Sequence, residues 1–99
     1  MHSAENANVQ VVIVTYNRAE YLRQCLSALR AQTYPIVQIT VVNNCSTDHT
    51  SLVLKEAIDH GMPLAEHRTT SNLGGAGGFA IAFELAMCQQ ADWVWVMDD

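Results

Sequence analysis

The stretch "VQVVIVTYN" (residues 9–17) decides the fold. Apolar residues, most of them β-branched, fill it almost without interruption, which is typical of a strand buried on both faces of a sheet. A strand of this kind needs helices on both sides of its sheet. The stretch therefore predicts an α/β protein with three layers, a sheet between two layers of helices.

The rest of the sequence alternates helical and extended patterns. Apolar spacing, capping residues and stop signals predict helices over residues 18–32, 46–61 and 79–90. Further strands are predicted over residues 37–44, 62–70 and 92–97, and the polarity of the 62–70 segment places it at a sheet edge. This order predicts a mostly parallel sheet whose chemistry lies at the carboxyl ends of its strands.

Composition limits the class of protein. The 99 residues are 49% hydrophobic and 15% charged, as expected for one small globular domain. The net charge of −5 argues against nucleic acid as a partner. The three Cys show no metal-binding spacing, which predicts reduced thiols in the cytosol. Apolar runs fall well short of the roughly 20 residues that span a bilayer, and residues 1–8 are expected to be a disordered terminus or a vector remnant.

Polar residues follow every predicted strand, at what should be one edge of the sheet. They occupy residues 15–18, 43–48, 71–78 and 98–99. Asparagine offers both a donor and an acceptor, which suits the edge of a nucleobase. The alternative is that Asn43, Asn44 and Ser46 only form a turn and cap the next helix. The residues alone leave both interpretations open.

The glycines before the third helix predict an anion site. Four of them, Gly74, Gly75, Gly77 and Gly78, precede a helical pattern. Glycines let the backbone approach a ligand closely, and a helix N-terminus favours phosphate. The alternative is a flexible loop without a ligand.

The adjacent carboxylates Asp98 and Asp99 have two interpretations. They are either a solvated strand end or oxygen ligands for Mg²⁺ or Mn²⁺, since a cation would relieve their repulsion. Trp93 and Trp95 should share one packed face of their strand. The three histidines 49, 60 and 67 are expected to be surface residues without partners.

Four motifs together carry a family resemblance. "VVIVTYNRAEYLRQCLSALRAQTYP", "ITVVNNCSTDHT", "NLGGAGGF" and "WVWVMDD" occur in this order. The set resembles the start of GT-A glycosyltransferases of the family 2 type, closest to the galactofuranosyltransferase and rhamnosyltransferase branch. The resemblance covers residues 9–99 and implies the Rossmann-like nucleotide-binding half of a GT-A fold.

The resemblance assigns roles to single residues. It implies that nucleotide-sugar contacts come from eleven residues: Thr15, Tyr16, Asn17, Arg18, Asn43, Asn44, Asn72, Gly74, Gly75, Gly77 and Gly78. Asn43 departs from the Asp common at its position, which puts the nucleotide preference in question. Asp98 and Asp99 match the first and middle positions of a DxD-type metal motif, and the catalytic base is expected downstream of residue 99.

The implied activity is sugar transfer from a nucleotide-diphosphate donor of the UDP or TDP type. The acceptor would be a hydroxyl of a glycan or lipid-linked molecule, and the reaction would be inverting and assisted by Mn²⁺ or Mg²⁺. Residues 9–99 are expected to be a half-domain truncated at the metal motif, so that this fragment binds nucleotide weakly, lacks transferase activity and self-associates. The parent enzyme is expected in the cytoplasm, at the inner face of the membrane.

Two other functions stay open at this point. "GAGGFA" (residues 75–80) fits the G-x-G-x-x-G/A pattern of NAD(P)-binding oxidoreductases, with Asp98 about twenty residues on. Against this, the glycines do not follow a buried strand closely. The third function is a non-catalytic module that binds a nucleotide or a protein.

Overall fold

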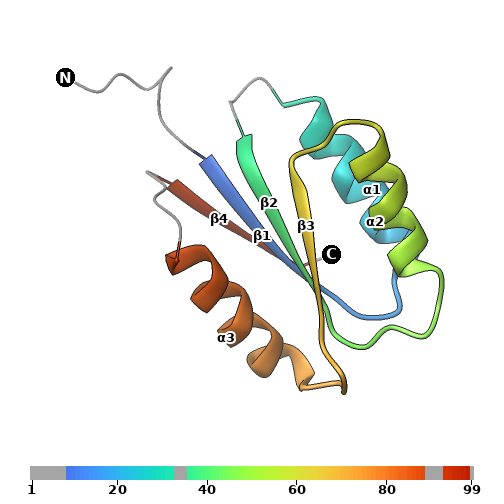
Figure 1. The fold of residues 1–99 in the computed structure, drawn as a ribbon, viewed down its shortest axis with the longest axis vertical. Helices are drawn as coiled ribbons and strands as arrows, with labels where there is room; N and C mark the ends of the chain where they lie inside the picture. Colours follow the sequence, from blue (N-terminus) through green and yellow to red (C-terminus); the bar gives the residue numbers. More distant parts are fainter. Residues whose placement is uncertain (1–8, 33–35, 89–92, 99) are drawn as a thin grey trace.

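The computed structural model describes residues 9–32, 36–88 and 93–98. These residues form strands and helices in strict alternation, as predicted (Figure 1). The elements in chain order are β1 (Val9–Thr15), α1 (Ala19–Arg30), β2 (Ile36–Asn43), α2 (Thr50–Asp59), β3 (Leu64–Arg68), α3 (Gly74–Met87) and β4 (Trp93–Asp98).

All four strands belong to one parallel sheet. Their order is β3-β2-β1-β4, so that β1, the first strand in sequence, lies inside the sheet. Every residue of β1 is buried, which confirms the two-sided burial predicted from its sequence. β3 lies at one edge and is largely exposed, as its polarity predicted. β4 lies at the other edge of the sheet that the described residues form.

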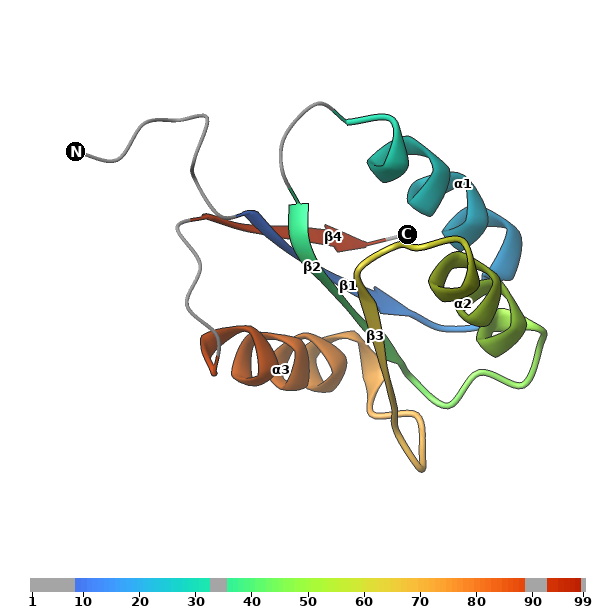
Figure 2. The ribbon, with the colours of Figure 1, turned by 45° about the horizontal axis from the view of Figure 1, so that its top comes forward.

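Helices cover both faces of the sheet. α1 and α2 lie together on one face, and α3 lies alone on the other (Figures 1 and 2). The side chains of β1 alternate between the two faces of the sheet. Val11 and Ile13 pack on the α1–α2 side, whereas Val12 and Val14 pack on the α3 side. The three-layer α/β/α architecture is therefore confirmed.

The α1–α2 side contains the larger core. Leu22, Leu26 and Leu29 recur along α1 at helical spacing, and all three are buried against the sheet. Trp95 packs against the same cluster, and Trp93 lies in register with Val9 two residues earlier in β4. The two tryptophans therefore share a face, as expected from period-two alternation, but the predicted packing is wrong for Trp93, which is 61% exposed.

The third helix begins earlier than predicted. The sequence predicted a glycine loop over residues 71–78 and a helix from residue 79, but α3 already starts at Gly74. The low helix propensity of glycine is overridden here by packing. A Cβ on Gly78 would lie 2.6 Å from Val14 Cγ1, so that a glycine is needed for α3 to approach β1 this closely.

The other elements agree with prediction except at their ends. α2 begins at Thr50 rather than near residue 46, because residues 46–49 form a loop that the sequence had suggested as a cap. In the described part of the chain, every helix is too short or too polar to cross a membrane. The expectation for residues 1–8 lies outside the described residues.

Candidate functional site

A pocket of about 210 Å³ opens at the carboxyl edge of the sheet. It lies between the β1–α1 loop and the start of α3. Three of the four predicted polar clusters contribute to its wall. The lining residues are Val14, Thr15, Tyr16, Arg18, Asn44, Asn72, Gly74, Gly75 and Phe79. The structure therefore brings together seven residues that the sequence had singled out, together with Val14 and Phe79, which it had not.

Asn44 joins the end of β2 to the segment that leads into α3. Its side chain is buried. Its Nδ2 donates to the Gly74 carbonyl (2.9 Å), and its Oδ1 accepts from the Leu73 N–H (2.8 Å) and the Thr69 hydroxyl (3.3 Å). These bonds fix the amino end of α3 against β2, and hence the position of the pocket wall.

Asn17 connects the loops after β1 and β2. It adopts a left-handed backbone with φ of 49°, a conformation that asparagine tolerates better than most residues. Its Oδ1 accepts from the N–H groups of Thr47 (2.7 Å) and Asp48 (3.2 Å), and its own N–H donates to Ser46 Oγ (2.9 Å). The side-chain oxygen of Asn17 is therefore bonded within the protein, and the predicted contact of Asn17 with a ligand stays a prediction.

Asn43 is fully buried at the end of β2. Its Oδ1 accepts from the Ser46 N–H (3.0 Å), and its Nδ2 donates to Ser51 Oγ (3.2 Å) and Glu66 Oε2 (2.9 Å). Both ends of the amide are thus engaged inside the protein. A contact between Asn43 and a nucleobase stays a prediction, and it would require exchange of these bonds.

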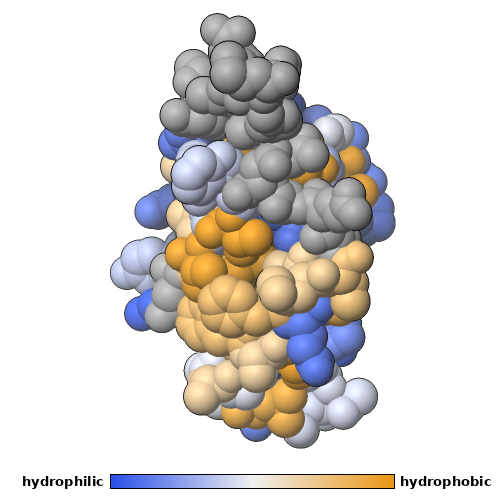
Figure 3. Space-filling view, turned by 90° about the vertical axis from the view of Figure 1, so that its left-hand side faces the viewer, coloured by the Kyte–Doolittle hydropathy of each residue, from blue (hydrophilic) through white to orange (hydrophobic). Residues whose placement is uncertain are grey.

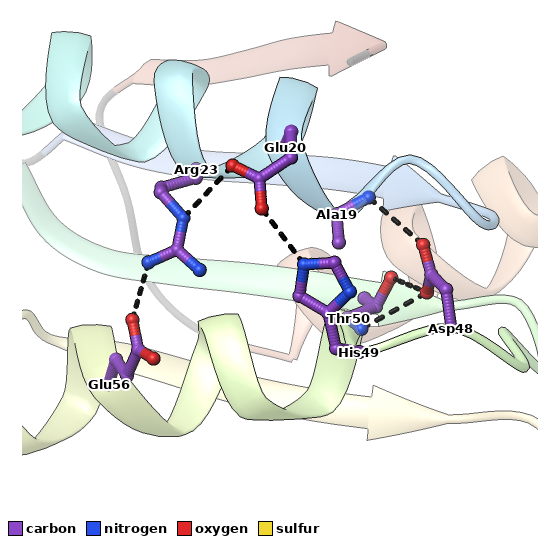
Figure 4. Close-up of polar contacts among 7 residues, drawn as sticks. All are labelled: Ala19, Glu20, Arg23, Asp48, His49, Thr50 and Glu56. Atoms are coloured by element: carbon purple, nitrogen blue, oxygen red, sulfur yellow. Dashed lines mark hydrogen bonds and ion pairs between the residues drawn. The ribbon is translucent and has the colours of Figure 1, made fainter.

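Asp48 accepts hydrogen bonds from the first turns of two helices (Figure 4). Its Oδ2 accepts from the Ala19 N–H of α1 (3.2 Å), and its Oδ1 accepts from the Thr50 N–H of α2 (3.0 Å) and from the Thr50 hydroxyl. One carboxylate therefore satisfies amide groups that no helix can pair internally. Its charge also complements both helix dipoles.

The same contacts change the acidity of Asp48. Burial on its own would raise the pKa of the carboxyl. The hydrogen bonds from the Thr50 hydroxyl and from the Ala19 and Thr50 amides outweigh burial, so that the pKa lies below its ordinary value. The carboxylate is thus ionised at neutral pH.

Ion pairs extend the contact between α1 and α2 along their surface (Figure 4). His49 Nε2 donates to Glu20 Oε1 (2.9 Å), and Arg23 bridges Glu20 and Glu56. The hydrogen bond from His49, together with the charge of Arg23, lowers the pKa of Glu20. His60 also donates, from Nδ1 to the Glu56 carbonyl (2.7 Å). The prediction that the histidines lack partners is therefore wrong for His49 and His60.

The four glycines divide into two pairs. Gly74 and Gly75 line the pocket, and Gly74 has a φ of +74° that favours glycine. Asn72 Oδ1 accepts from the Gly74 N–H (2.8 Å). Gly77 and Gly78 instead allow close packing, since a Cβ on Gly77 would lie 2.8 Å from Leu73 Cβ and one on Gly78 would clash with Val14. A ligand-binding role for the second pair stays a prediction.

The two residues predicted to bind a metal lie at and just after the end of β4 in the sequence. Asp98 is the last residue of β4 and lies in register with Val14, which lines the pocket. Carboxylate oxygens suit Mg²⁺ and Mn²⁺, so that residue type and position fit a divalent cation. Asp99 lies outside the described residues. A cation held here would neutralise charge on a bound phosphate group.

Two other pockets are at least as large as the one at the carboxyl edge of the sheet. One of about 390 Å³ lies at the amino ends of the strands, near Ile36, Gly61 and Pro63. One of about 230 Å³ lies between α1 and α2, near Arg23 and His60. Neither contains a predicted site residue, and parallel sheets bind ligands at the opposite, carboxyl edge.

Sequence comparison decides the family. Residues 10–99 match the model of "Glycosyl transferase family 2". The chain belongs to glycosyl transferase family 2. The match to the family model agrees with the family resemblance of the four sequence motifs and with the parallel sheet.

Related family 2 proteins span a much greater length than this chain. It is 39% identical over 94 residues to galactofuranosyltransferase GlfT1 of Mycobacterium tuberculosis, covering 93% of this chain and 30% of the relative. It is 35% identical to galactofuranosyltransferase GlfT1 of Mycolicibacterium smegmatis, with coverages of 92% and 29%. The chain therefore spans less than a third of the length of these two relatives.

A solved structure supports the GT-A form of the fold. The mannosyltransferase PcManGT from Pyrobaculum calidifontis, in complex with GDP-Man and Mn²⁺, matches with a TM-score of 0.76 and 25% sequence identity. The match covers 91% of this chain and 26% of that protein. The predicted fold class is thereby confirmed.

Proposed function

We propose that this family 2 chain is the donor-binding half of a glycosyltransferase that uses a nucleotide-diphosphate sugar of the UDP or TDP type. The observation that carries the proposal is the pocket at the carboxyl edge of the sheet, where three separate polar clusters meet. The mannosyltransferase neighbour, in complex with GDP-Man and Mn²⁺, supports a nucleotide sugar as the class of ligand.

The pocket offers suitable groups for a diphosphate and a nucleoside. Arg18 brings a cation to a chain with a net charge of −5, and Gly75 in the first turn of α3 supplies a backbone N–H at the pocket wall. Tyr16 is 44% exposed and presents an aromatic face. Asn72 and Gly74 would border the sugar and the diphosphate. A divalent cation, Mn²⁺ or Mg²⁺, would bind at Asp98 and Asp99.

The size of the pocket predicts weak binding. Pockets for small ligands usually measure about 300–1,000 Å³, whereas this one measures about 210 Å³. It can therefore enclose only part of a nucleotide sugar. We propose that residues 9–99 form the donor-binding half-domain, and that this chain alone binds nucleotide weakly and transfers no sugar.

The proposed reaction is an inverting displacement at the anomeric carbon. An acceptor hydroxyl, from a glycan or a lipid-linked molecule, would form the new bond as the nucleotide diphosphate departs. A carboxylate base outside this chain would remove the hydroxyl proton. The residues present here would bind and orient the donor, because Arg18 and Gly75 both line the pocket in which we place the diphosphate.

A thermal-shift panel tests this function. UDP, TDP, GDP and NAD(P) are compared with and without MnCl₂. Binding at a tenfold excess over Kd adds about 1.4 kcal/mol, equivalent to roughly 6–10 °C in a domain of this size. We expect stabilisation by a nucleotide diphosphate only when metal is present. Metal-independent stabilisation by NAD(P) would instead support an oxidoreductase, and no response to any nucleotide would support a non-catalytic module.

We also propose that the isolated chain self-associates through the β4 edge. Figure 3 shows an apolar area on the side that carries β4 and α3. The exposed large apolar residues of these two elements are Phe83, Met87, Trp93, Val94 and Val96. Edge strands with apolar side chains favour pairing with another chain. We expect light scattering to show dimers or larger species that Val96→Lys reduces; a wild-type monomer at high concentration would refute this.

We also propose a cytoplasmic location for the parent enzyme, at the inner face of the membrane. Cys25, Cys45 and Cys88 all fall in the described residues and form no disulfide there, which suits a reducing compartment. Fractionation of cells that express the parent enzyme tests it. Recovery in an oxidising compartment would contradict it.

A further inference from the structure

We propose that Asp48 is a positioning residue that holds Arg18 and Tyr16 at the pocket, an inference that rests on the proposed function. Asp48 does not line the pocket itself. It acts through the loop brace, defined as the hydrogen bonds by which Ser46, Thr47 and Asp48 hold Asn17 and Ala19.

The loop brace anchors the chain on both sides of Arg18. Before Arg18, Asn17 forms four hydrogen bonds with residues 46–48, between 2.7 and 3.4 Å long. After Arg18, the Ala19 N–H donates to Asp48 Oδ2 (3.2 Å). Arg18 is thus the single residue between two anchored neighbours. Its backbone direction at the pocket follows from the brace.

The Arg18 side chain lines the pocket but also contacts a ring on the surface of α1. Its guanidinium lies 5.2 Å from the centre of the Tyr21 ring, which is 62% exposed on the surface of α1. A cation–π contact at an exposed site is weak, at about 0.5–1 kcal/mol. The backbone bonds of Asn17 and Ala19 therefore limit the positions that the Arg18 side chain can reach.

Only a carboxylate can fill the role of Asp48. Its two oxygens accept in different directions, Oδ2 from α1 and Oδ1 from α2. Asparagine has one acceptor oxygen and one donor NH₂. Asp48→Asn can therefore still cap α2 through its oxygen, but it presents a donor to the Ala19 N–H. This substitution therefore removes the hydrogen bond to α1 and keeps the cap on α2.

The test compares Asp48→Asn with Ile39→Val in the complete 99-residue chain. Ile39 is buried in β2 and belongs to no hydrogen bond of the loop brace, so that its shortening lowers stability without changing the brace. Two ligand-free measurements come first: hydrogen exchange of the Ala19 and Thr50 amides, and the heteronuclear NOE of residues 16–18. In Asp48→Asn we expect Ala19 to exchange at least tenfold faster, Thr50 to stay protected, and the NOE of residues 16–18 to fall.

The third measurement is calorimetric titration with UDP and MgCl₂. We expect Asp48→Asn to weaken UDP binding at least fivefold, and Ile39→Val to leave it unchanged. Unchanged NOE values in Asp48→Asn, or equal losses of affinity in both variants, would overturn the positioning role. If UDP does not bind wild type, the proposed function fails, and the exchange and NOE results still decide whether Asp48 orders residues 16–18.

Discussion

Gly78→Ala should destabilise this protein, although alanine is normally the better helix former. In an unobstructed helix the substitution gains about 1 kcal/mol. Here the new Cβ would lie 2.6 Å from Val14 Cγ1, about 1 Å inside the optimal separation of two carbons. Overpacking of a core costs about 1–3 kcal/mol. We therefore expect a net loss of about 1 kcal/mol, and at most about 2.

Gly75→Ala is the matched control in the same helix. A Cβ on Gly75 would have no neighbour within 4 Å, so that only the propensity term applies. We expect this variant to be unchanged or stabilised by up to about 1 kcal/mol. Urea unfolding of both variants, without ligand, measures the difference. Each kcal/mol should also move Tm by roughly 4–8 °C.

A double-mutant cycle identifies the cause. Val14→Ala removes the atom that obstructs Gly78→Ala, so the cost of the two changes together should be less than the sum of their separate costs. The reasoning is refuted if Gly78→Ala stabilises the chain as Gly75→Ala does. It is also refuted if the costs at Val14 and Gly78 simply add.

Three further predictions concern the loops and the α1–α2 surface. Cys45→Gly should raise the free energy of unfolding by up to about 1 kcal/mol, because Cys45 has a φ of 62°; a loss in urea unfolding would contradict this. The pKa of Asp48 is lowered in the folded state, so that its stabilisation is complete above the ordinary carboxyl pKa of about 4 and is lost as pH falls through the folded value. As pH falls, the free energy of unfolding should therefore decrease less steeply in Asp48→Asn than in wild type. Identical pH dependence in the two proteins would refute this prediction. Arg23→Ala should leave the midpoint of urea unfolding almost unchanged, because the ion pair of Arg23 with Glu56 is exposed; a clear fall of the midpoint would show that the pair is coupled to the fold.

The sequence predicted the parts of the fold that depend on local pattern. Apolar runs located the strands, including the two-sided burial of β1 and the edge position of β3. The rule that parallel strands place chemistry at their carboxyl ends predicted that Tyr16, Asn44 and Gly74 would meet at one pocket. These inferences required no knowledge of the distances between elements.

Contacts between distant segments escaped prediction. The residue type of Asp48 suits a helix cap, but nothing local shows that its second oxygen reaches Ala19, 29 residues away. Glycine propensity placed the start of α3 too late, because the close approach to Val14 is a tertiary contact. The asparagines were matched to a ligand by their chemistry, yet Asn43 directs the same donor and acceptor to Ser46 and Glu66.

The central claim is that the pocket at the carboxyl edge of the sheet binds a nucleotide diphosphate. The most direct measurement is an NMR titration of the ¹⁵N-labelled chain with UDP and MgCl₂. We predict shifts concentrated at Tyr16, Arg18, Asn72 and Gly75, with slight change at Gly61 beside the opposite hollow. Shifts centred on Gly61, or no shifts at saturating UDP, would contradict the claim.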